Sequence, residues 1–115
     1  MEDEEVVRLC VAHVLESHGY TVTTAANGHD ALRIWERDKD KFQLILTDIV
    51  MPEGMNGLEL GQQLQRDRPT LKIIYSSGYS PDLIAQRSLQ LDGRNFLPKP
   101  YQAGALLRAV SQALA

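Results

Sequence analysis

The chain has 115 residues, of which 43% are hydrophobic and 23% are charged, and its formal net charge at pH 7 is −3. These values are ordinary for one globular domain with one modest core. The 12 basic residues are scattered along the chain, which argues against a nucleic-acid-binding surface because such surfaces need clustered Lys and Arg. Neither a membrane-spanning apolar run nor a signal-peptide pattern is present. We therefore expect a single cytoplasmic domain over residues 1–115 that binds neither nucleic acid nor a membrane.

Thiol and imidazole groups give no sign of a zinc site. Cys10 is the only cysteine, so the sequence contains no internal disulfide and no cysteine metal cluster. Its neighbours, VVRLCVAHVL, are apolar, and we expect Cys10 to be a small buried hydrophobe. The three histidines, at positions 13, 18 and 29, lack metal-ligand spacing and are interpreted as surface residues.

The first half of the chain alternates between helical and strand patterns. Residues 4–18 carry apolar side chains at helical spacing, which predicts a helix that stops at Gly19. Residues 20–25, YTVTTA, are rich in β-branched side chains and predict a strand with one wet face. A second helix is predicted over residues 27–38. The unbroken apolar centre of residues 42–47, FQLILT, predicts a strand buried on both faces.

The second half continues the alternation. Helices are predicted over 57–67, 80–91 and 103–114, and strands over 71–76 and 95–98. Strands that alternate with helices of this length indicate repeated βα units, and therefore an α/β domain with a parallel sheet. A parallel α/β domain is expected to begin with a strand, yet only Met1 precedes the acidic run EDEE. We therefore expect the first strand to be missing or truncated.

Polar side chains gather at the predicted carboxyl ends of the strands, where open parallel sheets bind their ligands. They are Asp48, Ser76, Ser77 and Lys99, joined by Glu2 and Asp3 at the end of the missing first strand. Converging carboxylates need a cation or a lysine to compensate their charge, and hard oxygen ligands without His or Cys favour Mg²⁺ or Mn²⁺ over zinc. A carboxylate can also attack phosphorus to give an aspartyl-phosphate. Asp48 is therefore placed to react.

Four motifs in this order carry a family resemblance: EDE before a helix, LTDIVMP with NGLEL, IIYSSGYS, and FLPKPY. Together they resemble the receiver domain of two-component response regulators, from residue 2 to the end of the chain. The resemblance implies a flavodoxin-like three-layer α/β/α fold with a doubly wound parallel sheet of strand order 2-1-3-4-5. In that order the missing first strand is central, so its absence would leave backbone groups unpaired.

By this resemblance, Asp48 accepts a phosphoryl group from a phosphohistidine on a partner histidine kinase or phosphotransfer domain. The resemblance further implies Mg²⁺ ligands at Glu2, Asp3, Asp48 and the Val50 carbonyl, a switch hydroxyl at Ser77, a phosphoryl contact at Lys99, an aromatic switch at Phe96 and a cis peptide bond before Pro100. Phosphorylation would shift the surface formed by residues 80–91, 95–98 and 103–114. Without the first strand, we expect weak Mg²⁺ binding, low stability, or strand exchange in a homodimer.

Other interpretations stay open. Asp48 alone could cap a turn, Glu2 and Asp3 could be a solvated helix start, and Ser76 competes with Ser77. The domain could be a pseudo-receiver that acts only as a protein-interaction surface. A phosphatase is remote because it would need a second acid two positions after Asp48, where Val50 stands. The SSGYS and FLPKPY motifs resemble receivers attached to hybrid sensor histidine kinases, which is the context we favour.

Overall fold

In the computed structural model of the chain, the structure describes residues 2, 4–49, 57–77 and 96–114. Its elements are α1 (Glu5–Ser17), α2 (Gly28–Asp38), the 3-10 helix η1 (Lys39–Lys41), β1 (Leu44–Asp48), α3 (Gly57–Asp67), β2 (Lys72–Ser77), β3 (Phe96–Pro98) and α5 (Ala103–Leu114). These elements confirm the predicted helices and strands within two residues at each end, apart from the two segments that follow. The helix predicted over 80–91 lies outside the described residues. The strand predicted over 20–25 is treated below.

The described strands form one parallel sheet in the order β1-β2-β3. The register pairs Leu44 with Lys72 at one end of β1 and Asp48 with Ser76 at the other. Between β2 and β3 it runs from Tyr75 opposite Phe96 to Ser77 opposite Pro98. Because the strands are parallel and in register, their carboxyl ends meet at one edge of the sheet, as the sequence predicts.

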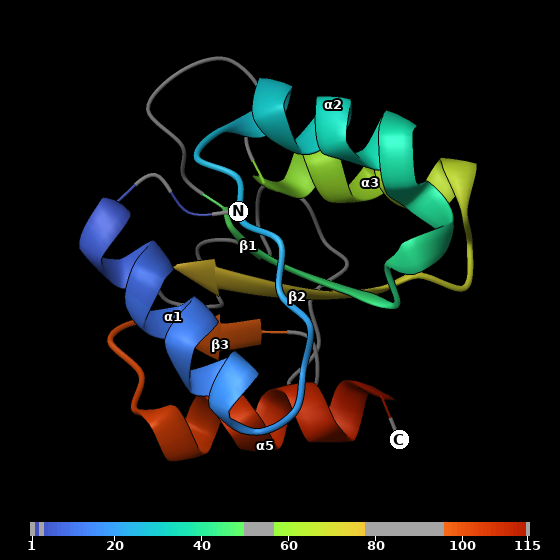
Figure 1. The fold of residues 1–115 in the computed structure, drawn as a ribbon. Helices are drawn as coiled ribbons and strands as arrows, with labels where there is room; N and C mark the ends of the chain where they lie inside the picture. Colours follow the sequence, from blue (N-terminus) through green and yellow to red (C-terminus); the bar gives the residue numbers. More distant parts are fainter. Residues whose placement is uncertain (1, 3, 50–56, 78–95, 115) are drawn as a thin grey trace.

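Helices cover both faces of this sheet, which gives the three-layer α/β/α arrangement (Figure 1). The figure shows α2 and α3 on one face and α1 and α5 on the other. Successive side chains of β2 point to opposite faces of the sheet. Ile73 and Tyr75 pack in the core under α2 and α3, whereas Ile74 packs in the core under α1 and α5. This alternation follows from the two-residue period of a strand.

Trp35 anchors the α2/α3 core. Its ring is 2% exposed and stacks on Phe42 with 6.3 Å between ring centroids. Its Nε1–H donates to Asp67 Oδ2 at 2.7 Å, which links α2 to α3. Leu60 and Leu64 of α3 complete this core and are almost fully buried. Burying such a leucine is worth roughly 1.5–3 kcal/mol, so the α2/α3 layer is held mainly by these contacts.

The strand predicted over residues 20–25 is wrong, because this segment is in no helix or strand. A strand needs a neighbouring backbone to bond with, and propensity alone does not make one. Between this segment and β1 lies a cavity of about 490 Å³, so no neighbouring strand is within reach. Of the residues before α1, the structure describes Glu2 and Glu4, and neither is in a strand.

The prediction for Cys10 is also wrong, since the structure places it at the surface. The side chains that α1 buries are Ala12 and Leu15, whereas Leu9 and Val6 are exposed, Val6 to 74%. Apolar residues occur on two sides of this helix, and the spacing alone did not reveal which side would face the sheet. The three histidines are exposed, as predicted.

Candidate functional site

Three charged side chains from separate segments meet at the carboxyl edge of the sheet. Asp48 ends β1, Lys99 follows β3, and Glu2 precedes α1. The Lys99 Nζ donates to Glu2 Oε1 at 2.9 Å and to an Asp48 carboxylate oxygen at 2.8 Å. These partners are 97 and 51 residues away from Lys99 in the sequence, so the fold brings them together. We call Glu2, Asp48 and Lys99 the carboxylate–lysine cluster.

The two carboxylates of this cluster are withdrawn from solvent. Asp48 is 6% exposed and Glu2 is 8% exposed. The backbone holds Glu2 in place: its N–H donates to the Ala25 carbonyl at 3.1 Å, and its own carbonyl accepts from Arg8 Nη1 at 3.0 Å. A buried charge is costly unless it is paired, and Lys99 supplies the pairing here.

The backbone around Asp48 is fixed on both sides. The Thr47 hydroxyl donates to the Asp48 carbonyl at 2.9 Å, and the Ile49 N–H donates to the Ser76 carbonyl at 2.9 Å. Gly57 lies against the same stretch, with its N–H donating to the Ile49 carbonyl at 2.9 Å. A Cβ at position 57 would overlap the Asp48 carbonyl oxygen. The start of α3 is therefore pressed onto the end of β1, and only glycine allows this approach.

The members of the carboxylate–lysine cluster shift one another's pKa values. Burial raises the pKa of Asp48, the neighbouring Glu2 raises it further, and Lys99 opposes both, which leaves the pKa at about 7. Burial works against the charge of Lys99, but the hydrogen bonds and charges of Asp48 and Glu2 outweigh it and raise the pKa of Lys99. Two carboxylates share one ammonium, so the cluster favours a further cation.

The two serine candidates at the end of β2 differ in their surroundings. Ser77 is buried, and its carbonyl accepts the Lys99 N–H at 2.9 Å, which ties it to the cluster through the backbone. Ser76 lies opposite Asp48 in the register and is 1% exposed. In the described part of the chain its Oγ has no hydrogen-bond partner. Both hydroxyls thus lie at the edge that carries the cluster.

The family follows from a comparison of the whole chain. Residues 1–111 match the response regulator receiver domain family. The chain belongs to this family. It is a receiver domain of two-component systems, and its flavodoxin-like α/β fold is confirmed.

Two Brucella abortus (strain 2308) proteins are similar to this receiver domain. It is 40% identical over 115 residues to the sensor kinase CckA, an alignment that covers 99% of the receiver domain and 12% of CckA. It is 35% identical over 119 residues to the response regulator receiver protein CpdR, covering 98% of the receiver domain and 92% of CpdR. The receiver domain thus spans a small part of CckA but nearly all of CpdR.

Solved structures show the same fold. A response regulator receiver domain protein from Clostridium thermocellum superposes with a TM-score of 0.86 at 24% identity, covering 98% of this receiver domain and 89% of that chain. The Vibrio cholerae chemotaxis protein CheY4 superposes with a TM-score of 0.83 at 27% identity, covering 98% and 93%.

The remaining predicted site residues fall into two groups. Phe96 is half-buried at the start of β3 and packs against the α2/α3 core, and the Lys99–Pro100 peptide bond is cis. Asp3 and Val50 lie outside the described residues. Among the residues that are described, no set of three His, Cys, Asp or Glu side chains is grouped to hold a metal ion. The acids described beside Lys99 are Glu2 and Asp48.

Sequence reasoning missed three positioning features of this receiver domain. The Arg8 guanidinium donates a hydrogen bond to the Glu2 carbonyl across the start of α1. No local sequence pattern predicts this contact. Gly57 permits the approach of α3, and the Asn56–Gly57 pair signals only a turn. Tyr101 is half-buried, and burial raises its pKa to about 12, with the charge of Lys99 opposing the rise and the charges of Asp48 and Glu2 adding to it. Within the described residues, no helix is both long and apolar enough to cross a membrane.

Proposed function

We propose that this receiver domain accepts a phosphoryl group on Asp48 from a phosphohistidine of a histidine kinase or phosphotransfer domain. The observation that carries the proposal is a buried carboxylate at a strand end, 2.8 Å from a lysine ammonium. In the transfer, an Asp48 carboxylate oxygen forms a bond to phosphorus while the bond from phosphorus to the histidine nitrogen breaks. The electron pair of the broken bond stays on the imidazole, which then takes up a proton.

Lys99 contributes charge compensation. Phosphoryl transfer is catalysed mainly by positioning and by neutralising the phosphoryl oxygens. The Lys99 Nζ already bonds the attacking carboxylate, so it lies where the incoming oxygens gather. The raised pKa of Lys99 keeps this ammonium charged over the physiological pH range.

The donor set also fits Mg²⁺ or Mn²⁺, the cation that we expect this site to use. Glu2 and Asp48 would hold it, with Asp3 and the Val50 carbonyl completing the set. Support comes from the pKa of Asp48, which burial and Glu2 raise to about 7, because a hard divalent cation offsets such crowding of carboxylates. When bound, the ion neutralises phosphoryl oxygens and keeps Asp48 ionised.

We further propose that Ser77 and Phe96 report phosphorylation to the surface formed by residues 80–91, β3 and α5. Ser77 is joined to Lys99 through the backbone, and Phe96 lies opposite Tyr75 in the register. Phe96 begins β3, the strand that leads to Lys99, and it packs against the α2/α3 core. A change in the Ser77 hydroxyl and in the Phe96 ring would shift the population of surface conformations.

The context that we propose is a hybrid sensor histidine kinase in the cytoplasm. The 40% identity to CckA supports it, while the coverage of CpdR supports a stand-alone regulator as the alternative. Homodimerisation by strand exchange is also proposed, because β1 has a cavity along one side. A pseudo-receiver that only binds partners is the second candidate, favoured by the bond that Lys99 already makes to both carboxylates.

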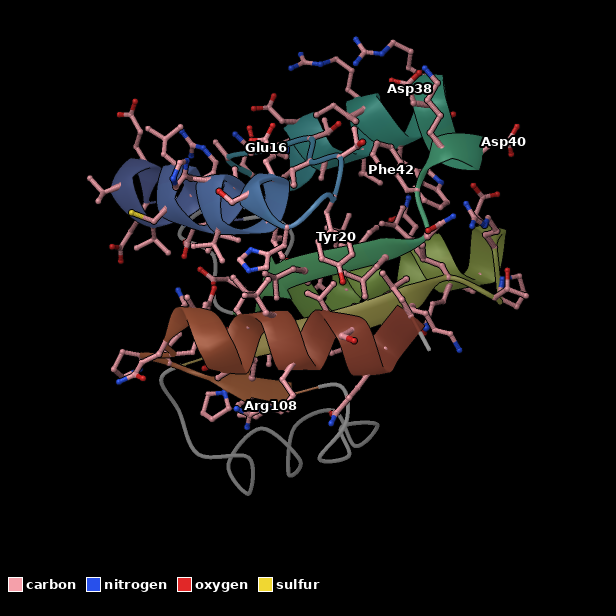
Figure 2. All side chains as sticks on the ribbon, turned by 60° about the horizontal axis from the view of Figure 1, so that its bottom comes forward. Glu16, Tyr20, Asp38, Asp40, Phe42 and Arg108 are labelled. Atoms are coloured by element: carbon pink, nitrogen blue, oxygen red, sulfur yellow. The ribbon has the colours of Figure 1, made fainter. Side chains whose placement is uncertain are left out.

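Intact-mass spectrometry after incubation with acetyl phosphate, a small phosphodonor, separates the two candidates. We expect one phosphoryl group per chain with Mg²⁺ and none with EDTA, and the label should be lost in Asp48→Asn. The matched control is Asp40→Asn, because Asp40 is exposed on η1 and points away from the fold (Figure 2). Labelling of Asp48→Asn to the same extent would reject Asp48 as acceptor, and no labelling of the native chain would favour the pseudo-receiver.

A further inference from the structure

Glu2 is held by contacts at both its side chain and its backbone. Its carboxylate oxygen Oε1 accepts from Lys99 Nζ at 2.9 Å, and Oε2 accepts from the Glu4 N–H at 3.3 Å. The Glu2 N–H donates to the Ala25 carbonyl at 3.1 Å, and the Glu2 carbonyl accepts from Arg8 Nη1 at 3.0 Å. Of these four contacts, the one from Arg8 comes from a side chain that is not itself a member of the cluster.

Arg8 reaches back across the start of α1 to make this contact. Its backbone N–H donates to the carbonyl of Glu4, the N-cap residue, at 2.9 Å, so Arg8 belongs to the first hydrogen-bonded turn of the helix. Arg8 is half-buried. The body of α1 is fixed in turn by Leu15, which packs in the α1/α5 core. The guanidinium therefore ties the backbone of Glu2 to a helix that is anchored on the sheet.

The charge of Arg8 and its hydrogen bond would affect a bound cation in opposite directions. A positive charge near a cation site weakens cation binding by repulsion, whereas a group that orients a ligand strengthens it. The side chains that shift the pKa of Asp48 are Glu2 and Lys99. The contact from Arg8 goes to the Glu2 carbonyl, so Arg8 acts on the cluster through the position of Glu2.

We propose that Arg8 is a positioning residue for the divalent cation of this receiver domain: by binding the Glu2 carbonyl, it keeps the Glu2 carboxylate directed toward Asp48 and Lys99. The inference rests on the proposed role of Glu2 as a ligand for Mg²⁺ or Mn²⁺, and it adds the residue that fixes this ligand. Groups that orient metal ligands typically contribute roughly 10–100-fold to metal affinity. Arg8 acts through the ligand's backbone, so we expect the lower end, about tenfold.

Binding of Mn²⁺ alone to the whole chain, without a phosphodonor, tests this proposal. The electron paramagnetic resonance signal of free Mn²⁺ is lost on binding and gives the Kd. Arg8→Met keeps an apolar stem but removes the donor and the charge, whereas Arg8→Lys keeps the stem, the charge and a donor for one carbonyl. We expect Arg8→Met to raise the Kd about tenfold and Arg8→Lys to remain within about threefold of the native chain.

The matched control is Arg37→Met, which removes the same charge from an exposed side chain at the end of α2. It should leave the Kd for Mn²⁺ unchanged. Tighter binding by Arg8→Met would show that Arg8 acts through its charge, and unchanged binding would show that the other contacts suffice to hold Glu2. Equal weakening by Arg8→Met and Arg8→Lys would show that the hydrogen bond is not responsible. Each of these three results would overturn the proposal.

Amide hydrogen exchange in EDTA tests the positioning of Glu2 without any metal. In Arg8→Met, exchange at the Glu2 N–H should be about tenfold faster, because Glu2 is held less firmly against the Ala25 carbonyl. Exchange at Ile74, in the middle of β2, should not change. Equal acceleration at both amides would mean that Arg8 supports the whole fold, and this would contradict the proposal. If Arg8→Met does not fold, Arg8→Gln replaces it in both experiments, because its amide is too short to reach the Glu2 carbonyl.

The native chain separates a failure of this inference from a failure of the proposed function. If the native chain binds Mn²⁺ and Arg8→Met binds it equally well, the role of Arg8 is wrong and the proposed phosphoryl acceptance stands. If the native chain binds no Mn²⁺ even at millimolar concentration, the proposed cation site is wrong, and the role of Arg8 is rejected with it.

Discussion

β1 and β2 are neighbouring strands with similar sequences, LILTD and KIIYSS, yet the structure buries them differently. Ile73, Ile74 and Tyr75 of β2 are buried, with Ile74 completely inaccessible, whereas Leu44 and Leu46 of β1 are half-buried. β2 has a strand on each side. β1 has β2 on one side and, on the other, the cavity of about 490 Å³ that separates it from residues 20–25. The difference shows that neighbours, and not the composition of a strand, decide how deeply it is buried.

Truncating one leucine or isoleucine in each strand should expose this difference most strongly. Ile74→Ala removes methyl and methylene groups from a closed core and should lower the free energy of unfolding by about 4 kcal/mol. Leu44→Ala, on the half-buried strand, should cost about 1 kcal/mol, because its surroundings already contain space. Urea unfolding of both variants measures the two costs. Equal costs would mean that β1 is as tightly packed as β2.

The close approach of Gly57, at the start of α3, to the end of β1 allows a second test. Gly57→Ala places a Cβ on the Asp48 carbonyl oxygen, so it should cost about 2–3 kcal/mol and reduce phosphoryl uptake by displacing the end of β1. Gly104→Ala on α5 is the matched control. A Cβ there meets no atom within 4 Å, and the change should stabilise the chain by about 0.5 kcal/mol. Similar unfolding midpoints for the two variants would contradict the close approach of α3 to β1.

The pH dependence of stability tests the crowding of the cluster. Because the pKa of Asp48 is raised from 3.8 to about 7 in the folded chain, the folded state holds a proton that the unfolded state has lost in this range. The stability that protonated Asp48 contributes is therefore fully present below pH 3.8. This contribution is lost as the pH rises from 3.8 to about 7. Asp48→Asn should remove this loss and raise the free energy of unfolding at pH 8 on the order of 1 kcal/mol.

Chemical unfolding in EDTA at several pH values measures this effect. Asp40→Asn, at an exposed position, should keep the pH profile of the native chain. A native profile that rises between pH 4 and 7, together with a destabilised Asp48→Asn, would show that Lys99 more than offsets the burial of Asp48.

The smallest expected effects are those of replacing the two serines of β2, Ser76 and Ser77, and they distinguish the roles of these residues. Ser76→Ala removes a buried hydroxyl that has no partner among the described residues, so stability should stay the same or rise by up to about 1 kcal/mol. Phosphoryl uptake should not change. Ser77→Ala should instead impair the chemical-shift response of Phe96 to phosphorylation. The reverse pattern would assign the switch hydroxyl to Ser76.

The strand-end argument predicted the cluster because it depends on few assumptions. Once residues 44–48 and 96–98 are parallel strands, Asp48 and Lys99 must lie at the same edge. The predicted strand at 20–25 failed because a ladder needs a partner that local propensity does not supply. Cys10 was misplaced because α1 carries apolar residues on two sides, and only the packed sheet decides between them. The contact from Arg8 to the Glu2 carbonyl depends on the path of the chain before α1, which no spacing rule predicts.

The most direct test of the central claim is binding of beryllofluoride, a phosphoryl mimic, followed by two-dimensional amide NMR. With Mg²⁺, we predict saturable shifts at Asp48, Ser77 and Lys99 that are absent with EDTA and absent in Asp48→Asn. Shifts of equal size in Asp48→Asn, or no shifts in the native chain at saturating Mg²⁺, would contradict a phosphoryl-accepting site at the carboxylate–lysine cluster.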